Sequence, residues 1–250
     1  FKRFDTMPNI NFFQGDCMEF MRGKPDKYYD LAVVDPEYGI DAANMNLGRS
    51  HRKLFLTTNY IDKDWDKQRP SEHYFSELFR VSKNQIICGG NYFADNLPIS
   101  KGWVFWDKLQ PSGISFGMGE LIWTSFEKPI QKITVSIASG SNRVSSCPTK
   151  VKSTRIHPTQ KPIQLYKELL KLYAKPGERI LDTHGGSMGS AIACFDLGFD
   201  LDICELDPDY FKAGKERFER HVDRWHKGLN EPRVDNNDYS TLNTGLFSQV

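Results

Sequence analysis

The sequence predicts an α/β fold around one mostly parallel sheet, because strand-like apolar segments alternate with helix-like amphipathic segments along the chain. A chain of 250 residues can bury one substantial core, so we expect a single domain with a small insertion. Hydrophobic residues make up 39% and charged residues 26% of the chain, which is typical of a globular protein. No apolar run approaches the ~20 residues of a membrane span, so we expect no membrane partner.

The first half of the chain supplies most of the expected strands. Residues 30–34 end in a continuous apolar run, which is typical of a buried strand. Ser71 is a candidate N-cap in front of a helix that contains Phe75 and Leu78. The expected strands lie at 10–14, 30–34, 85–88, 103–106 and 121–126, and the expected helices lie at 17–22 and 71–80.

The second half resumes the alternation after a polar interval. Residues 128–156 are rich in Ser, Thr and Lys and lack a clear period, so we expect an inserted loop or recognition segment there. Pro162 is favourable in the first turn of the helix that follows, which runs through Leu172. Beyond it we expect strands at 179–181 and 200–204, helices at 189–197 and 208–225, and a polar tail at 229–250.

Cysteine and histidine spacing indicates neither a disulfide framework nor a metal site. The five cysteines contain no Cys-x-x-Cys pair, and the six histidines also lack metal-binding spacing. We therefore expect reduced thiols, a cytoplasmic location and no zinc.

Basic residues are unevenly distributed, although the net charge of +1 by itself argues weakly against a nucleic-acid partner. Seven basic residues and no acid lie from Lys128 to Lys161, and a second acid-free basic cluster lies between Asp41 and Asp62. These segments are either solvated loops or contacts for DNA phosphates, and their position beside the motifs described below favours phosphate contact. The candidate DNA-binding residues are Arg49, Arg52, Lys53, Arg143, Lys150, Lys152 and Arg155.

A glycine-rich turn at 182–189 follows an expected strand and precedes an expected helix. Such a turn lets the backbone approach a ligand closely at the carboxyl edge of a sheet. Glu205 ends the next strand about 20 residues later, where an acid can accept ribose hydroxyls. Dinucleotide dehydrogenases and methyltransferases share this pair of features, and a glycine-lined turn without any ligand is a third interpretation. The absence of a full G-x-G-x-x-G pattern weakens the dehydrogenase interpretation.

An acid–proline–aromatic motif follows the strand at 30–34. The Asp35 carboxylate and the Pro36 carbonyl could accept hydrogen bonds from an exocyclic amine, which favours a nitrogen with an available lone pair. Tyr38 could stack on a base, and such stacking contributes roughly 1–3 kcal/mol. Flipping a base out of a duplex costs a few kcal/mol, so the two effects are comparable. A plain turn after a buried strand is the alternative interpretation.

The combined pattern GDC…DPEYG…HPTQKP…ILD…GG…ELD…YF resembles the permuted β group of amino-directed DNA methyltransferases, of prokaryotic or phage type. The resemblance covers roughly residues 15–218, and in that group, as here, the catalytic motif precedes the cofactor motif. It implies a circularly permuted, Rossmann-like class I methyltransferase fold that uses S-adenosyl-L-methionine (AdoMet). It also implies methylation of adenine N6 or cytosine N4 in double-stranded DNA by base flipping, and Asp35 in the first motif position favours adenine.

The resemblance assigns roles to individual residues and regions. It implies a catalytic region at 10–127, target recognition at about 128–156 and AdoMet binding at 157–228, all within one methyltransferase domain at 1–228. The expected sheet has seven strands, with strand 10–14 beside the strand that ends at Glu205 and a reversed aromatic hairpin near Trp103 and Trp123. The implied catalytic residues are Asp35, Pro36 and Tyr38, and the implied AdoMet-binding residues are Asp16, Thr159, Lys161, Asp182, Gly185, Gly186, Ser187 and Glu205.

Two positions depart from the family pattern. Glu37 replaces the second proline of the catalytic motif, so a carboxylate lies beside the target base unless its side chain points away. Met188 replaces a glycine, so we expect an ordinary backbone conformation there. These departures keep a catalytically silent DNA-binding relative open, beside an N4-cytosine methyltransferase and an NAD-dependent oxidoreductase. The short recognition segment leaves a homodimer or a specificity partner open as well.

Overall fold

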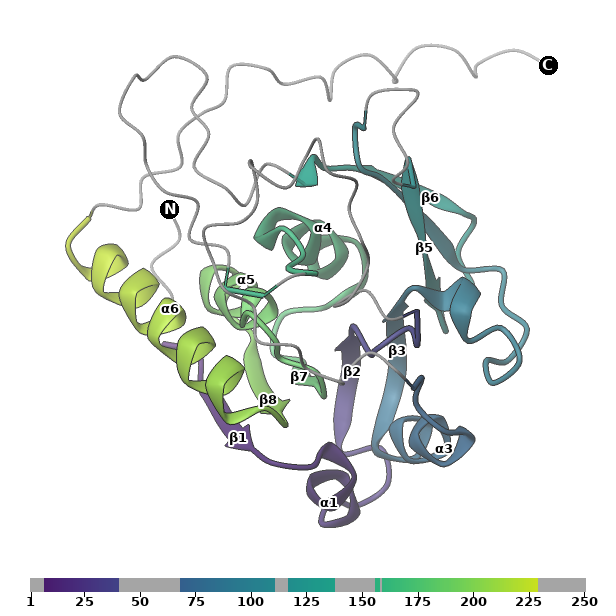
Figure 1. The fold of residues 1–250 in the computed structure, drawn as a ribbon, viewed down its shortest axis with the longest axis horizontal. Coiled ribbons are helices and arrows are strands. Elements are labelled where there is room, and N and C mark those ends of the chain that lie inside the picture. Colours follow the sequence, from purple (N-terminus) through teal and green to yellow (C-terminus); the bar gives the residue numbers. More distant parts are fainter. Residues whose placement is uncertain (1–6, 41–67, 111–116, 138–155, 158, 229–250) are drawn as a thin grey trace.

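The computed structural model describes residues 7–40, 68–110, 117–137, 156–157 and 159–228. In this part of the chain, an eight-stranded sheet has the order β1-β8-β7-β2-β3-β5-β4-β6 (Figure 1). The strands are β1 (Ile10–Gln14), β2 (Tyr29–Val34), β3 (Ser82–Cys88), β4 (Trp103–Asp107), β5 (Gly119–Thr124), β6 (Gln131–Thr134), β7 (Arg179–Asp182) and β8 (Asp200–Glu205).

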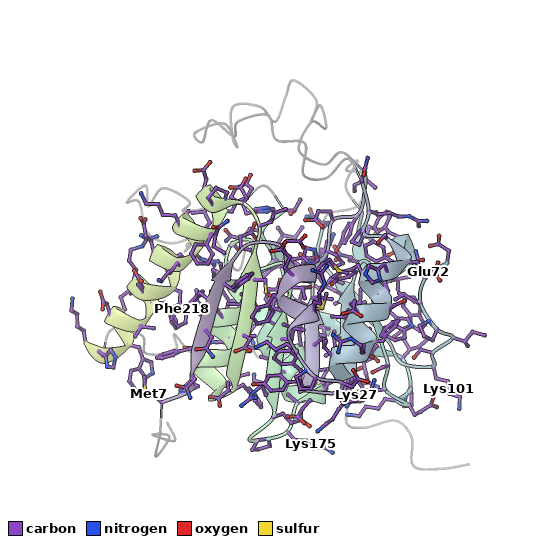
Figure 2. The ribbon with its side chains drawn as sticks, turned by 90° about the horizontal axis from the view of Figure 1, so that it is seen from below. Met7, Lys27, Glu72, Lys101, Lys175 and Phe218 are labelled. Carbon is purple, nitrogen blue, oxygen red and sulfur yellow. The ribbon has the colours of Figure 1, made fainter. Side chains whose placement is uncertain are left out.

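Helices cover both faces of the sheet, so the fold has three layers (Figures 1 and 2). The alternation of side chains along β2 explains this arrangement: Leu31 and Val33 enter one buried cluster, whereas Ala32 and Val34 enter the other. The first cluster is covered by α4 (Ile163–Tyr173), α5 (Gly189–Leu197) and α6 (Pro208–His226), and the second by α1 (Cys17–Arg22) and α3 (Glu72–Val81). The α/β prediction is confirmed.

Strand β1 pairs in parallel with β8, with Gln14 opposite Glu205. The first strand of the chain therefore lies beside one of its last, as the permuted order predicts. Strand β5 is antiparallel to β3 and β4, while every other strand pair among the described residues is parallel. Trp103 lies opposite Trp123, so the reversed aromatic hairpin is also confirmed.

The expected number of strands was wrong by one. The eighth strand, β6, comes from the segment at 128–156 that we expected to be an insertion, and it pairs with β4 at the end of the sheet. Ile133 of this strand and Val135 just beyond it are buried, so their burial stabilises an edge strand. A strand of four residues with one buried side chain is too short to show a period.

The expected helices and most of the expected strands are present, with bounds that differ by a few residues. Ser71 is the N-cap residue of α3, but its side chain makes no capping hydrogen bond. Within the described residues, no helix combines the length and the apolar character needed to cross a membrane.

Candidate active site

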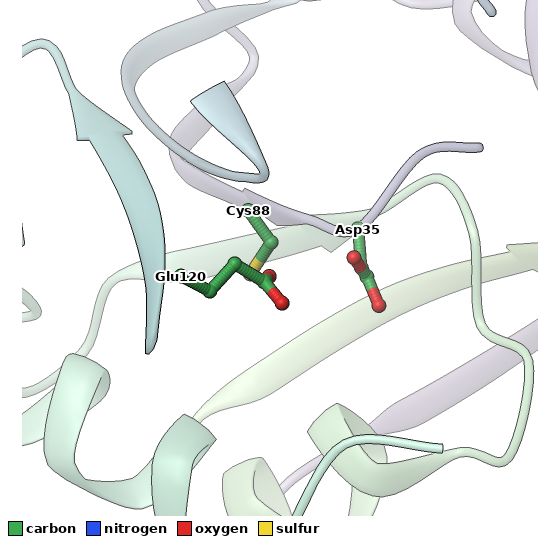
Figure 3. A group of neighbouring side chains, drawn as sticks. All are labelled: Asp35, Cys88 and Glu120. Atoms are coloured by element: carbon green, nitrogen blue, oxygen red, sulfur yellow. The ribbon is translucent and has the colours of Figure 1, made fainter. Parts of the chain in front are cut away.

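The ends of the parallel strands bring the polar side chains of the site to one edge of the sheet. Asp35 follows β2, Asp182 ends β7 and Glu205 ends β8. Because β5 runs in the opposite direction, its first residues lie at the same edge, and Glu120 enters the site from there. Figure 3 shows Asp35 and Glu120 approaching each other from these separate elements, with Cys88 of β3 between them.

Lys161 joins the segments that the sequence singled out separately. Its ammonium nitrogen lies 2.6 Å from Asp35 Oδ1 and 3.1 Å from Glu120 Oε1, and it donates to the Tyr38 hydroxyl at 2.8 Å. The Tyr38 hydroxyl lies 2.9 Å from Asp35 Oδ1 and 2.7 Å from Glu120 Oε1, so it can donate its hydrogen to either carboxylate. We call Asp35, Tyr38, Lys108, Glu120 and Lys161 the lysine cluster.

The lysine cluster balances its own charge. Lys108 lies 3.1 Å from the second oxygen of Glu120, so two ammonium groups face two carboxylates. Burial would raise the pKa of Glu120, but Lys161 and Lys108 outweigh it and hold that pKa below its usual value. Burial raises the pKa of Asp35, and Glu120 adds to the rise against the opposing charge of Lys161. Burial would lower the pKa of Lys161, but Asp35 and Glu120 outweigh it, so this side chain stays charged.

Asp35, Cys88 and Glu120 place potential metal-ligand atoms within 4.8 Å of one another (Figure 3). The Lys161 ammonium already bridges the two carboxylates and supplies the positive charge that a metal ion would bring. Burial raises the pKa of the Cys88 thiol well above its ordinary value, which keeps it protonated and makes it a poor ligand. The chemistry of these residues therefore fits an ammonium centre better than a metal centre.

The ring of Tyr38 is fixed by aromatic packing. It stacks on Tyr92, with 4.7 Å between ring centroids and an interplanar angle of 15°, and it meets Phe93 edge-on at 5.9 Å. Gly89 has φ 65°, and a Cβ there would lie 2.3 Å from the Tyr38 ring, so only glycine fits at this position. Stacking of Tyr38 on a target base stays a prediction.

In the glycine turn, the two predicted cofactor acids bind backbone amides. Asp182 is buried; its carboxylate accepts from the backbone N–H of His184 at 3.0 Å and from the hydroxyl of Ser190. Burial raises the pKa of Asp182 to about 6. The carboxylate of Glu205 accepts from the backbone N–H of Gly186 at 2.7 Å and from that of Asp207 at 2.8 Å. Both acids therefore hold the shape of the turn.

Our expectation of an ordinary backbone at Met188 was wrong. Met188 has φ 57° and ψ 34°, which is the left-handed conformation. Its side chain is fully buried, and a Cβ at Gly214 of α6 would lie 2.6 Å from the Met188 Cγ. Tertiary packing against Gly214 thus holds Met188 in a conformation that glycine adopts more easily. Neighbouring Ser187 accepts from Arg217 through its carbonyl oxygen.

A family model described as DNA methylase, that of the N6 and N4 methyltransferases, matches residues 94–216. This chain belongs to the N6/N4 DNA methylase family. The Type II methyltransferase M1.MboII of Moraxella bovis is 22% identical over 243 residues, which cover 79% of this chain and 92% of that protein. The Type II methyltransferase M.HinfI of Haemophilus influenzae is 25% identical over 285 residues, which cover 94% of this chain and 73% of that protein.

Solved structures of DNA methylases share the fold. The complex of M1.HpyAVI with AdoMet matches with a TM-score of 0.52 and 17% identity, covering 83% of this chain and 98% of that chain. The cytosine-N4-specific PvuII DNA methyltransferase matches with a TM-score of 0.53 and 13% identity, covering 91% and 97% of the two chains. The predicted class I methyltransferase fold is confirmed. The predicted cofactor, AdoMet, is the one on which this methylase family depends.

The remaining predicted residues of this DNA methylase lie in different surroundings. Asp16 is the N-cap of α1 and accepts from the backbone N–H of Met18 at 2.8 Å. Thr159 is exposed, with its hydroxyl 3.1 Å from His157 Nδ1. Lys161, which we expected near the methionyl end of the cofactor, contacts Asp35 in the lysine cluster. The predicted DNA-binding residues Arg49, Arg52, Lys53, Arg143, Lys150, Lys152 and Arg155 lie outside the described residues.

Sequence reasoning missed Glu120 and Lys108 as members of the methylase site. The available signal was the position of Glu120 at the start of an aromatic strand and of Lys108 directly after another. Glu37, which we expected beside the target base unless it points away, pairs with His184 and so lies outside the lysine cluster.

Proposed function

We propose that this DNA methylase transfers the methyl group of AdoMet to N6 of adenine in double-stranded DNA, after the adenine is flipped out of the duplex. The observation that carries the proposal is the fixed Asp35 carboxylate. It lies at the end of β2, held by Lys161 at 2.6 Å, and β2 pairs directly with β7, which leads into the glycine turn.

The Asp35 carboxylate and the Pro36 carbonyl would accept hydrogen bonds from the exocyclic amine of the target base. Forming the nitrogen–carbon bond requires the amine to lose one proton, and Asp35 is the acceptor at hand. Because burial raises the pKa of Asp35, this carboxylate is a better proton acceptor than an exposed one. Lys161 and Tyr38 fix its orientation, which reduces the reorganisation needed during the reaction.

The residues of the glycine turn fit a nucleoside cofactor. Gly186 has φ 48°, and among the described residues a Cβ added there would find no atom closer than 3.9 Å, so a ligand can approach its backbone. AdoMet supplies an electrophilic methyl group when it is bound. The residues that would hold it are Asp16, Thr159, Asp182, Gly185, Gly186, Ser187 and Glu205, with Asp182 and Glu205 also shaping the turn.

The basic residues of segments 49–53 and 143–155 would contact DNA phosphates. The affinity for DNA should then fall steeply with added salt, with a slope on a double-logarithmic plot that grows with the number of phosphates contacted. Replacing Lys150 and Lys152 together by Gln should reduce that slope by about two units. A slope unchanged from the wild type would contradict this assignment. A cytoplasmic location and either a homodimer or a specificity partner remain parts of the same proposal.

The test is transfer of labelled methyl from AdoMet to unmethylated genomic DNA, followed by mass spectrometry of the nucleosides. We expect N6-methyladenine with the wild type and none with Asp35→Ala, which should still bind AdoMet. N4-methylcytosine would keep the mechanism and overturn the adenine assignment. Absence of product, with AdoMet bound and DNA bound, would overturn the enzymatic function and support a silent DNA-binding relative.

A further inference from the structure

Glu37, the residue that replaces a proline of the catalytic motif, forms an ion pair with His184 of the glycine turn. The two charged atoms, Glu37 Oε2 and His184 Nε2, lie 3.2 Å apart. We propose that this Glu37–His184 pair is a positioning device that fixes the catalytic loop after β2 relative to the cofactor turn after β7. The inference rests on the proposed methyl transfer and concerns how its two halves are aligned.

The imidazole of His184 is held from several sides and therefore forms a rigid anchor. Its Nδ1 lies 2.9 Å from the hydroxyl of Thr183, which lies 2.7 Å from the hydroxyl of Tyr74. The ring of Tyr74 also packs edge-on against the imidazole, with 5.3 Å between centroids. Because α3 carries Tyr74, the anchor is tied to a helix as well as to the turn. Glu37 consequently meets a partner whose position is already fixed.

Burial and charge favour the ionised form of both partners. The side chains are 30% and 17% exposed for Glu37 and His184, so solvent screens the pair only in part. Three carboxylates act on the imidazole: Glu37 across the pair, Asp182 of the same turn and Glu205 of β8. Burial would lower the pKa of His184, but these carboxylates outweigh it and raise the pKa to about 9. The pair is therefore charged on both sides near neutral pH.

The position of the pair in the sequence explains its effect on the reaction. Glu37 lies two residues after Asp35, and His184 lies two residues before Gly186. The pair thus connects the backbone that carries the acceptor carboxylate to the backbone that would hold the methyl donor. A misplacement of about 1 Å between reacting groups can cost about 100-fold in rate. Neither side chain needs to touch the base to have this effect.

The experiment compares Glu37→Gln, His184→Phe and the double variant in single-turnover methyl transfer to unmethylated genomic DNA. Each single substitution should lower the rate about tenfold, and the double variant should be no slower than either one, because the residues act as a unit. The affinity for AdoMet should change less than about twofold. Glu127→Gln is the matched control, since that side chain is 77% exposed and pairs only with exposed Lys101. It should keep the wild-type rate.

Additive losses, or a Glu37→Gln rate equal to that of the wild type, would overturn the inference. A second readout is independent of activity: titration of the His184 ring protons by nuclear magnetic resonance. The pKa of His184 should fall in Glu37→Gln and stay unchanged in Glu127→Gln; no fall in Glu37→Gln would also overturn the inference. Wild-type transfer is measured first and decides the proposed function alone, so the two failures are distinguishable.

Discussion

The catalytic edge and the cofactor turn of this methylase are held in place by different forces. At the end of β2, the lysine cluster assembles charged side chains from separate segments, with an ammonium 2.6 Å from one carboxylate and 3.1 Å from another. After β7, by contrast, the turn is shaped by backbone: Asp182 and Glu205 accept from its amides, while Gly186 and Met188 adopt left-handed conformations. One region depends on charge balance and the other on chain conformation.

This difference separates the expected consequences of substitution. A buried charge network loses much of its stability when one partner is removed, because the remaining charges lack compensation. A turn held by backbone hydrogen bonds responds chiefly to changes in conformation and packing. Substitutions in the lysine cluster should therefore change both chemistry and pH dependence, whereas substitutions in the turn should change stability.

The largest effect should follow removal of the central ammonium in Lys161→Met. Its side chain is only 5% exposed, so Asp35 and Glu120 would face each other with one compensating charge fewer. We expect the free energy of unfolding to fall by about 3–5 kcal/mol and methyl transfer to fall at least about 100-fold. Urea denaturation and single-turnover transfer measure the two effects.

Lys171→Met is the matched control for that substitution. The Lys171 side chain is 52% exposed and pairs with Glu168 on the surface of α4. Its replacement should change stability by less than about 0.5 kcal/mol. Equal effects of the two substitutions would show that the lysine cluster has no special role.

A smaller effect, on rate and pH dependence, should follow Glu120→Gln. The Glu120 carboxylate contributes to the raised pKa of Asp35, so neutralising it should lower that pKa. Asp35 would stay ionised to a lower pH, and the acidic limb of the rate profile should move to lower pH. Lys161 and Tyr38 would also lose a charged acceptor, which should reduce the plateau rate about tenfold. Single-turnover rates between about pH 5 and 8 test both points, with Glu127→Gln as the control; an acidic limb that stays in place would contradict the electrostatic role.

The two regions also differ in how far the sequence predicts them. The glycine turn is predictable because its strand, turn and helix are contiguous, and strand β7, the turn and α5 all lie where we expected them. The lysine cluster draws on distant segments, and the sequence indicated Asp35, Tyr38 and Lys161 only through separate motifs. Glu120 and Lys108 were missed because their position depends on the reversed direction of β5 beside β4. No local pattern places the start of an antiparallel strand at the carboxyl edge of its parallel neighbours.

Tertiary packing accounts for the other misses. A methionine at 188 argues locally against left-handed backbone, yet burial against Gly214 imposes it. Strand β6 depends on the burial of Ile133 beside β4, which a four-residue segment does not announce. Glu37 and His184 were each noticed in the sequence, but their pairing requires β2 and β7 to be neighbours.

The turn offers a substitution that tests conformation against packing. Met188→Gly would relieve about 1 kcal/mol of left-handed strain but would remove a side chain that is fully buried. The lost packing should dominate, so we expect a net destabilisation of about 2 kcal/mol in urea denaturation. A stabilised Met188→Gly variant would mean that backbone conformation alone determines the turn.

Leu109→Gly is the control for that substitution, because Leu109 is also left-handed, with φ 51°, but is 60% exposed. With little packing to lose, this variant should be stabilised by up to about 1 kcal/mol. A destabilised Leu109→Gly variant would remove the contrast between packing and strain.

The smallest expected effect, about 1 kcal/mol because the pair is partly solvated, is the pH dependence of the Glu37–His184 pair, which joins the two regions. The pKa of His184 is raised from 6.5 to about 9 in the folded protein, so its contribution to stability is complete below 6.5 and disappears as the pH rises through about 9. Burial would raise the pKa of Glu37, but His184 lowers it below 4.5, so that contribution is present above 4.5 and is lost in acid. The stability difference between the wild type and His184→Phe should therefore be constant from about pH 5 to 6.5 and shrink by about 1 kcal/mol towards pH 9. Urea denaturation across this range measures it, and a difference that stays constant up to pH 9 would show that the pair carries no charge-dependent stability and that the two regions are held independently.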